Sequence, residues 1–160
     1  MDKSFMIPSA LRHDVKVAIT EAGMCGPLGV VSGAADVAAI AGCWGILLVK
    51  YARYFKVTIC KKSAVDICTT LLLGMGGYYA GCRMATRAMQ FIPGAGWLIG
   101  AGVSSVANVV FTYRYALALA CVFAGGENRL ASLAASITTV MAGMGSVMSL
   151  KEIVSLYRTV

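Results

Sequence analysis

The sequence is short of charge. Charged residues make up 13% of its 160 residues, about half of the roughly 25% that soluble globular domains carry. Apolar residues make up 59%, above the usual range of about 45–50%, and they fall in blocks instead of being spread evenly. A soluble globule with this composition would lack charged surface, so the composition favours residence in a membrane.

Familiar catalytic patterns are also missing. His13 is the only histidine, and no partner residues stand at the spacing that zinc or a general base would need, so we expect a solvated side chain. There is no P-loop, no Gly-x-Ser-x-Gly and no pair of carboxylates. The glycines of 94–100 follow a proline instead of a strand, and the next acidic residue is Glu127, which disfavours a dinucleotide-binding turn. We therefore expect no enzyme activity, no cofactor and no metal.

The cysteines form no C-x-x-C pair and no regular framework. Most of them lie inside apolar runs, where a reduced thiol behaves as a small hydrophobic group. The first ten residues show no apolar run after a basic start, so no signal peptide is expected there and insertion would depend on internal segments. The six cysteines are Cys25, Cys43, Cys60, Cys68, Cys82 and Cys121.

Apolar blocks predict an all-α protein. They cover about 27–49, 65–82, 93–125 and 130–150, and the second is marginal in length for a hydrocarbon core of about 30 Å. An amphipathic segment over 9–23 precedes them and should lie at an interface or pack across the bundle. We expect one domain over 1–160, a bundle of apolar helical hairpins with about four long helices and this amphipathic N-terminal helix. The apolar face of the N-terminal helix consists of Leu11, Val15, Ala18, Ile19 and Ala22.

A basic aromatic stretch closes the first block. It contains Lys50, Tyr51, Arg53, Tyr54 and Lys56, and such residues are typical of the headgroup region at the edge of a membrane-spanning segment. The net charge of +7 suits an anionic lipid surface. Because the basic residues gather at the ends of apolar runs instead of forming one tract, nucleic acid is the disfavoured partner. The positive-inside rule makes the loop 50–62 the best cytoplasmic candidate.

Glycine pairs at four-residue spacing suggest close helix packing. Such a pair lies on one face of a helix and lets another backbone approach, which is how apolar helices associate in lipid. With 18 glycines in the chain, some pairs are expected by chance. The candidate packing pairs are Gly29 with Gly33, Gly77 with Gly81, and Gly96 with Gly100.

Polar residues interrupt two apolar blocks. Asp36 lies in the first, while Asn108 and Arg114 lie in the third. Ionisable groups in apolar segments are costly unless they pair, face water or reach a polar edge. One interpretation is that these three residues line a polar cavity or pore. The other is that Asp36 caps a broken helix while Arg114 reaches a polar edge beside two tyrosines.

The chain resembles the helical domain that accompanies the G domain in immunity-related GTPases and in bacterial GTPase-associated membrane proteins. The resemblance lies in residues 26–29 (Gly-Pro-Leu-Gly) with Asp36 downstream, in the basic aromatic stretch through Tyr54, and in residues 91–96 (Phe-Ile-Pro-Gly-Ala-Gly) leading through Gly100 to Tyr113. It implies a membrane-associated, often oligomeric bundle of helical hairpins. Because this chain has no P-loop or other G-domain element, GTPase activity does not carry over.

Two functions follow as hypotheses. The first is a non-enzymatic, homo-oligomeric membrane protein that forms a pore or a membrane-organising scaffold. The second is a soluble or peripheral helical adaptor, which buries its apolar faces in an oligomer and binds a separate GTPase or another protein.

Overall fold

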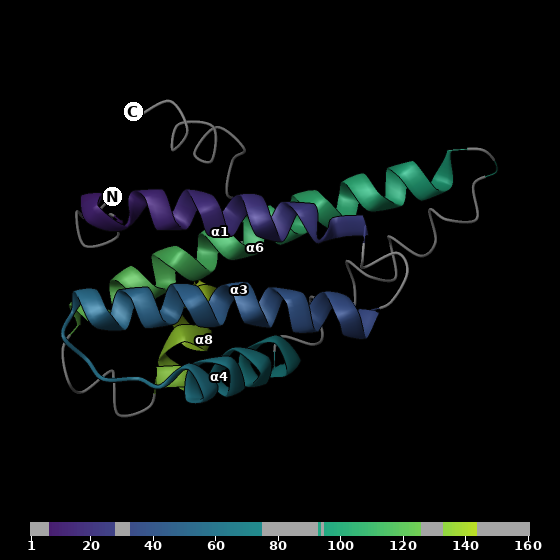
Figure 1. Cartoon of the computed structure of the whole chain (residues 1–160). Coiled ribbons are helices and arrows are strands. Elements are labelled where there is room, and N and C mark those ends of the chain that lie inside the picture. Colours follow the sequence, from purple (N-terminus) through teal and green to yellow (C-terminus); the bar gives the residue numbers. More distant parts are fainter. Residues whose placement is uncertain (1–6, 28–32, 75–92, 94, 126–132, 144–160) are drawn as a thin grey trace.

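Helices make up the secondary structure of the part of the chain that can be described. A computed structural model describes residues 7–27, 33–74, 93, 95–125 and 133–143, and these residues contain no strand. The all-α prediction is confirmed for them. The elements are the short 3-10 helix η2 (Ser9–Leu11) and the α-helices α1 (Arg12–Met24), α3 (Gly33–Tyr54), α4 (Lys61–Gly74), α6 (Gly96–Ala124) and α8 (Leu133–Gly143), shown in Figure 1.

The helix boundaries depart from the apolar blocks where hydropathy and helix propensity differ. α3 continues beyond the first block to Tyr54, and α4 begins at Lys61, ahead of the second block. Lysine and arginine are good helix formers, so a helix runs on where an apolar run stops. α6 matches the third block closely because Pro93 lies just before it and Gly125 caps its end. The remainder of the second block, 75–82, lies outside the described residues.

α1 is the amphipathic helix predicted near the N-terminus. The residues predicted for its apolar face are all buried, and α1 packs against both α6 and α3. It runs antiparallel to α6, since Gly23 lies against Val109 and Gly26 lies against Ser105. α1 therefore covers the two longest helices along its whole length and turns its polar side outward.

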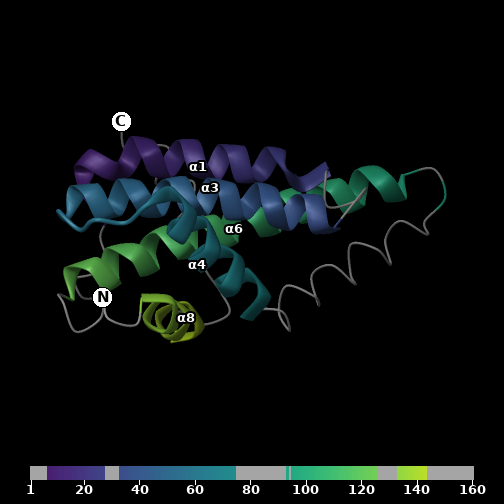
Figure 2. The same ribbon diagram turned by 60° about the horizontal axis from the view of Figure 1, so that its bottom comes forward.

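α3 and α6 form the centre of the bundle and run parallel. Trp44 contacts Thr112 and Tyr115, and Tyr51 contacts Phe123 further along both helices. Figures 1 and 2 show that the first turns of α6 project beyond the neighbouring ends of α1 and α3. Of the described helices, α6 therefore reaches furthest on that side.

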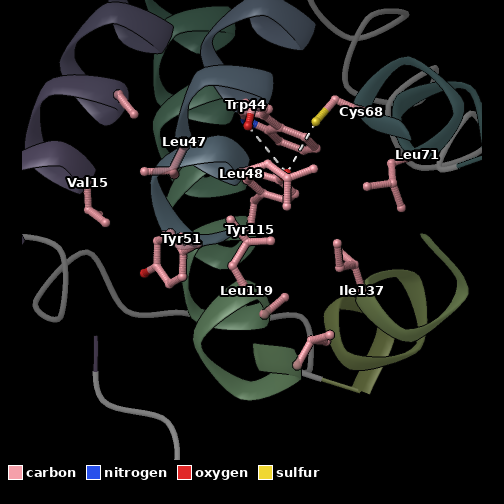
Figure 3. Packing of buried hydrophobic residues seen from close by; sticks show 14 of the residues in the cluster. Val15, Trp44, Leu47, Leu48, Tyr51, Cys68, Leu71, Tyr115, Leu119 and Ile137 are labelled. Carbon is pink, nitrogen blue, oxygen red and sulfur yellow. Dashed lines mark hydrogen bonds between the residues drawn. The ribbon is translucent and has the colours of Figure 1, made fainter. Parts of the chain in front are cut away.

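α4 and α8 pack on the side of α3 and α6 away from α1. Val65 of α4 lies against Gly45 of α3, where an added Cβ would be 2.9 Å from the valine Cγ2. Ile137 of α8 is fully buried and faces the core together with Leu71 of α4 and Leu119 of α6 (Figure 3). One continuous apolar core therefore joins the described helices.

α3 ends at Tyr54 and is followed, two residues on, by a residue with a left-handed backbone. Lys56 has a φ of 60°, its N–H donates to the Arg53 carbonyl at 3.1 Å, and the Val57 N–H donates to the Ala52 carbonyl at 2.8 Å. This is the Schellman pattern, in which glycine is the usual residue at the left-handed position.

Replacing Lys56 with glycine is expected to raise the free energy of unfolding by about 1 kcal/mol, because the Cβ that opposes a left-handed backbone is removed. Urea unfolding followed by circular dichroism measures this gain. Lys56→Ala is the control, since it removes the charge but keeps the Cβ. An equal gain in both variants would contradict the explanation from backbone strain.

Candidate functional site

Two buried side chains from the predicted polar set meet between α3 and α6. The Asn108 amide Nδ2 donates a hydrogen bond to Asp36 Oδ1 at 3.2 Å. Asp36 is 0% exposed and Asn108 is 2% exposed, so water is excluded from the pair within one copy of the bundle. Asp36 also lies in the first turn of α3, where a carboxylate is favoured by the helix dipole. The arrangement therefore gives the carboxylate a structural partner in an apolar part of the core.

Arg114 leaves α6 on a different side from Asn108. Six residues separate them, which corresponds to a rotation of about 120° around an α-helix. Arg114 is 7% exposed and lies between Thr112 and Tyr115, the two residues of α6 that contact Trp44. The structure thus brings Asp36 and Asn108 together and places Arg114 apart from them.

A second polar cluster joins α3, α4 and α6, further along α3 and α6 than the pair of Asp36 and Asn108. Trp44 Nε1 donates to Thr112 Oγ1 at 2.9 Å, and its ring stacks on Tyr115 at a centroid distance of 4.3 Å. The Tyr115 hydroxyl lies 3.2 Å from the Cys68 Sγ of α4 and 3.4 Å from the Trp44 carbonyl. Figure 3 shows Trp44, Tyr115 and Cys68 converging in the core. Each polar atom in this cluster has a partner, as burial requires.

Basic residues gather at the end of the bundle where α1 begins, α3 ends and α4 begins, which we call the basic end. Lys50 at this end pairs with Asp14 of α1. Tyr54 is 49% exposed, whereas Tyr51 is fully buried against Phe123. Of the predicted boundary residues, Tyr51 therefore belongs to the core and the other four face outward. The basic end consists of Arg12, Lys16, Lys50, Arg53, Lys56, Lys61 and Lys62.

The opposite half of the bundle, which we call the apolar end, carries no exposed charge among its described residues. It begins at the level of Trp44 and Thr112. The exposed charged residues nearest to that level, on the side of the basic end, are Glu21 and Asp66. The Glu21 side chain faces Cys43 of α3. Asp66 follows Val65, which packs on Gly45. The apolar end comprises the described residues of 22–27, 33–43, 67–74 and 93–111, and the one charged residue among them, Asp36, is buried.

Large apolar side chains are exposed at the apolar end. Trp97, Leu98 and Ile99 are consecutive in the first turn of α6 and are 55%, 66% and 43% exposed. The sequence interpretation does not single out this run, because it considers the surrounding glycines only as a helix-packing pair and as a disfavoured cofactor turn. Its signal was three large apolar residues with no charged residue nearby. The other exposed large apolar residues of the apolar end are Met24, Leu73 and Val106.

Hydroxyl groups on the surface of α4 in this half are satisfied within the helix. Thr69 Oγ1 donates to the Val65 carbonyl and Thr70 Oγ1 donates to the Asp66 carbonyl, both at 2.9 Å. A threonine bonded in this way presents no unsatisfied donor to a hydrocarbon environment. The hydroxyl groups of Thr69 and Thr70 are therefore compatible with a lipid environment.

In the part of the chain that the structure describes, two helices are long and apolar enough to cross a membrane. They are α6 and the part of α3 from Ala35 to Tyr54. More than half of each stretch is buried inside the bundle, and core helices of soluble proteins have the same length and composition. This gives weak support for a membrane location and does not orient the loop 50–62.

The glycine pairs predicted for helix packing are described only in part. Gly96 and Gly100 are buried on one face of α6 and Gly33 begins α3, whereas Gly29, Gly77 and Gly81 lie outside the described residues. A close backbone approach occurs instead at Gly26, where an added Cβ would lie 2.6 Å from the Ser105 nitrogen. The four-residue spacing does not identify Gly26, which lies beyond the end of α1 and three residues from Gly23.

Cys60 lies at the basic end, directly before the first residue of α4. The Ser63 hydroxyl lies 3.0 Å from its Sγ and the Ser63 N–H donates to it at 3.4 Å. These hydrogen bonds lower the pKa of the Cys60 thiol below its ordinary value, because they stabilise the thiolate.

Ser63→Ala is therefore expected to move the Cys60 pKa upward, since it removes the hydroxyl and keeps the backbone N–H. The pH dependence of alkylation at Cys60 by a charged maleimide, followed by mass spectrometry, measures the shift. A midpoint that stays where it is in the unchanged protein would show that the Ser63 hydroxyl does not stabilise the thiolate.

Comparisons of the chain with protein-family models, with curated proteins and with solved structures found no match. The resemblance to the helical domains of immunity-related GTPases stays a prediction.

Proposed function

We propose that this chain is a non-enzymatic membrane protein that self-associates in the bilayer, where it organises the membrane or forms a pore. The observation that supports this proposal is the separation of charge among the described residues of the bundle, which gives it a basic end and an apolar end. Soluble helical bundles have little physical reason for such a separation, because water surrounds both ends.

The dimensions of the two ends agree with a membrane surface. Lys50 lies six residues along α3 from Trp44, about 9 Å at the rise of an α-helix. If the apolar end enters hydrocarbon as far as Trp44, the basic residues therefore lie among the headgroups. Each basic side chain near an anionic surface contributes about 1 kcal/mol to binding. Anionic lipid is thus the proposed partner of the basic end.

Extraction of cell membranes with alkaline carbonate tests membrane insertion. The expected result is that the protein stays in the membrane pellet, because carbonate releases proteins held by charge alone. Release of all the protein into the supernatant would contradict insertion. Chemical cross-linking in the same membranes tests self-association, for which a ladder of multiples of the chain is expected.

The pore version makes an additional demand on the buried polar residues. Asp36 and Asn108 are excluded from water within one bundle, so a conducting path would run between copies or form after rearrangement. Asp36→Asn or Arg114→Ala is then expected to change ion flux through reconstituted liposomes. Unchanged flux in both variants would leave the scaffold version.

The second candidate function is a soluble or peripheral adaptor that forms a discrete oligomer and binds a separate protein. The burial of more than half of α3 and α6 inside the bundle favours it, as does the polar outer side of α1 alongside them. Purification without detergent as an assembly of one defined size would support this candidate. Aggregation without detergent and a single species with detergent would support the membrane proposal.

A further inference from the structure

We propose that the apolar end enters one side of the bilayer while the bundle stays intact, with Trp97, Leu98 and Ile99 inserted most deeply. This inference rests on the proposed membrane function and adds to it the surface, the depth and the state of the bundle. Its occupant is the hydrocarbon of a bilayer that contains anionic lipid.

The residues that we propose to insert most deeply lie in the part of α6 that projects from the bundle. The first turns of α6 project beyond the ends of α1 and α3 in both views (Figures 1 and 2). Trp97, Leu98 and Ile99 belong to these turns and are 43–66% exposed. Large apolar residues exposed together at one end of a fold are typical of interaction with a membrane or a protein. The charge distribution favours a membrane over a protein, because the basic end lies at the opposite end of the bundle from Trp97, Leu98 and Ile99.

The depth of insertion follows from where charged residues begin. Trp97 precedes Thr112 by 15 residues on α6, a distance of about 22 Å. Glu21 and Asp66 stand at the level of Thr112 and are exposed, so deeper insertion would place carboxylates in hydrocarbon. Because the hydrocarbon core is about 30 Å thick, the tip passes the middle of the bilayer and does not reach the far headgroups.

Opening of the bundle on insertion is energetically unfavourable, because it would expose buried polar groups to lipid. Asp36 and Asn108, the most polar pair in the apolar end, already bond to each other away from the surface. Opening α3 from α6 would expose that pair to lipid and break the stack of Trp44 on Tyr115. Lipid offers these groups no hydrogen-bond partners, so the closed bundle is the favoured inserted form.

The two tryptophans of the chain allow a direct test. Trp97 lies at the tip and Trp44 is 0% exposed in the core, so each reports on one part of the inference. The full-length chain and its Trp97→Phe variant are mixed with vesicles of phosphatidylcholine and phosphatidylserine whose acyl chains carry bromine at different depths. Flotation of the vesicles is measured in the same samples, and circular dichroism confirms that the variant folds.

The unchanged protein is expected to float and to lose tryptophan fluorescence, most strongly with bromines near the chain ends. Trp97→Phe is expected to float and to lose little fluorescence, because Trp44 stays inside the bundle. Equally strong quenching in the variant would show that lipid reaches Trp44, which overturns the intact bundle. Flotation without quenching of Trp97 would overturn the inserted tip and leave the proposed membrane function standing. Failure to float would overturn the proposed function itself and the inserted tip with it.

Discussion

Replacing Trp44 with alanine is expected to lower the free energy of unfolding by about 4 kcal/mol, in the middle of the range for a buried tryptophan. Trp44 is fully buried and lies between α3, α6 and α4 in Figure 3. Its ring stacks on Tyr115 at an interplanar angle of 5°, and its Nε1 donates to Thr112. The substitution leaves a cavity at the centre of the bundle and a buried hydroxyl without its donor.

Urea unfolding of the purified protein, followed by circular dichroism, measures this loss. Trp44→Phe keeps a ring against Tyr115 and removes the hydrogen bond, so a smaller loss of about 1–2 kcal/mol is expected. Trp97→Ala is the matched control, since it removes the same side chain from an exposed position. If Trp44→Ala and Trp97→Ala lost equal stability, the placement of Trp44 in the core would be wrong.

The second large effect is expected at Gly26. An added Cβ there would lie 2.0 Å from the Ser105 Oγ and 2.6–2.7 Å from the Ser105 backbone. The hydroxyl can rotate away, but the backbone of α6 cannot move without disturbing its packing. Gly26→Ala is therefore expected to destabilise the protein by about 3 kcal/mol, the upper end of the usual cost of overpacking. The loss arises because the residues that follow α1 are pushed away from α6, which loosens the packing of α1 on α6.

Gly102→Ala and Gly42→Ala are the matched controls for this substitution. An added Cβ at either position meets nothing within 4 Å, and both residues lie inside helices. Alanine is favoured over glycine in a helix by about 1 kcal/mol, so both controls are expected to be neutral or stabilising. A Gly26→Ala variant as stable as these controls would rule out the close approach of α1 to α6.

Local sequence pattern was enough to predict the helices and the buried face of α1. Apolar residues at helical spacing, such as Val15, Ala18, Ile19 and Ala22, mark a face directly, and these four residues are buried. The same spacing continues from Trp44 to Tyr51, seven residues on. The basic residues on both sides of Tyr51 nevertheless predict a membrane boundary there, so its burial does not follow from the local pattern alone. Its burial follows from the continuation of α3 to Tyr54.

Pairing between helices could not be predicted from spacing. Asp36 and Asn108 were singled out one at a time as polar residues in apolar blocks, and their contact depends on the parallel alignment of α3 and α6. The separation of basic and apolar ends depends equally on the antiparallel placement of α1. In α1 the charged residues come before the residues that lie in the apolar end. In α3 the basic residues come after the residues that lie there. The two patterns coincide only once the helices are packed.

Vesicle flotation of three forms of the protein tests the central claim, that the apolar end enters a bilayer. The forms are the unchanged protein, Leu98→Glu at the tip, and Val17→Glu on the exposed side of α1; both substitutions make the same change in charge. A carboxylate in hydrocarbon costs about 3 kcal/mol on insertion scales, which corresponds to roughly a hundredfold weaker binding. The unchanged protein and Val17→Glu are expected to float with phosphatidylserine-containing vesicles, while Leu98→Glu stays behind. Equal flotation of all three forms, or failure of the unchanged protein to float, would contradict the claim.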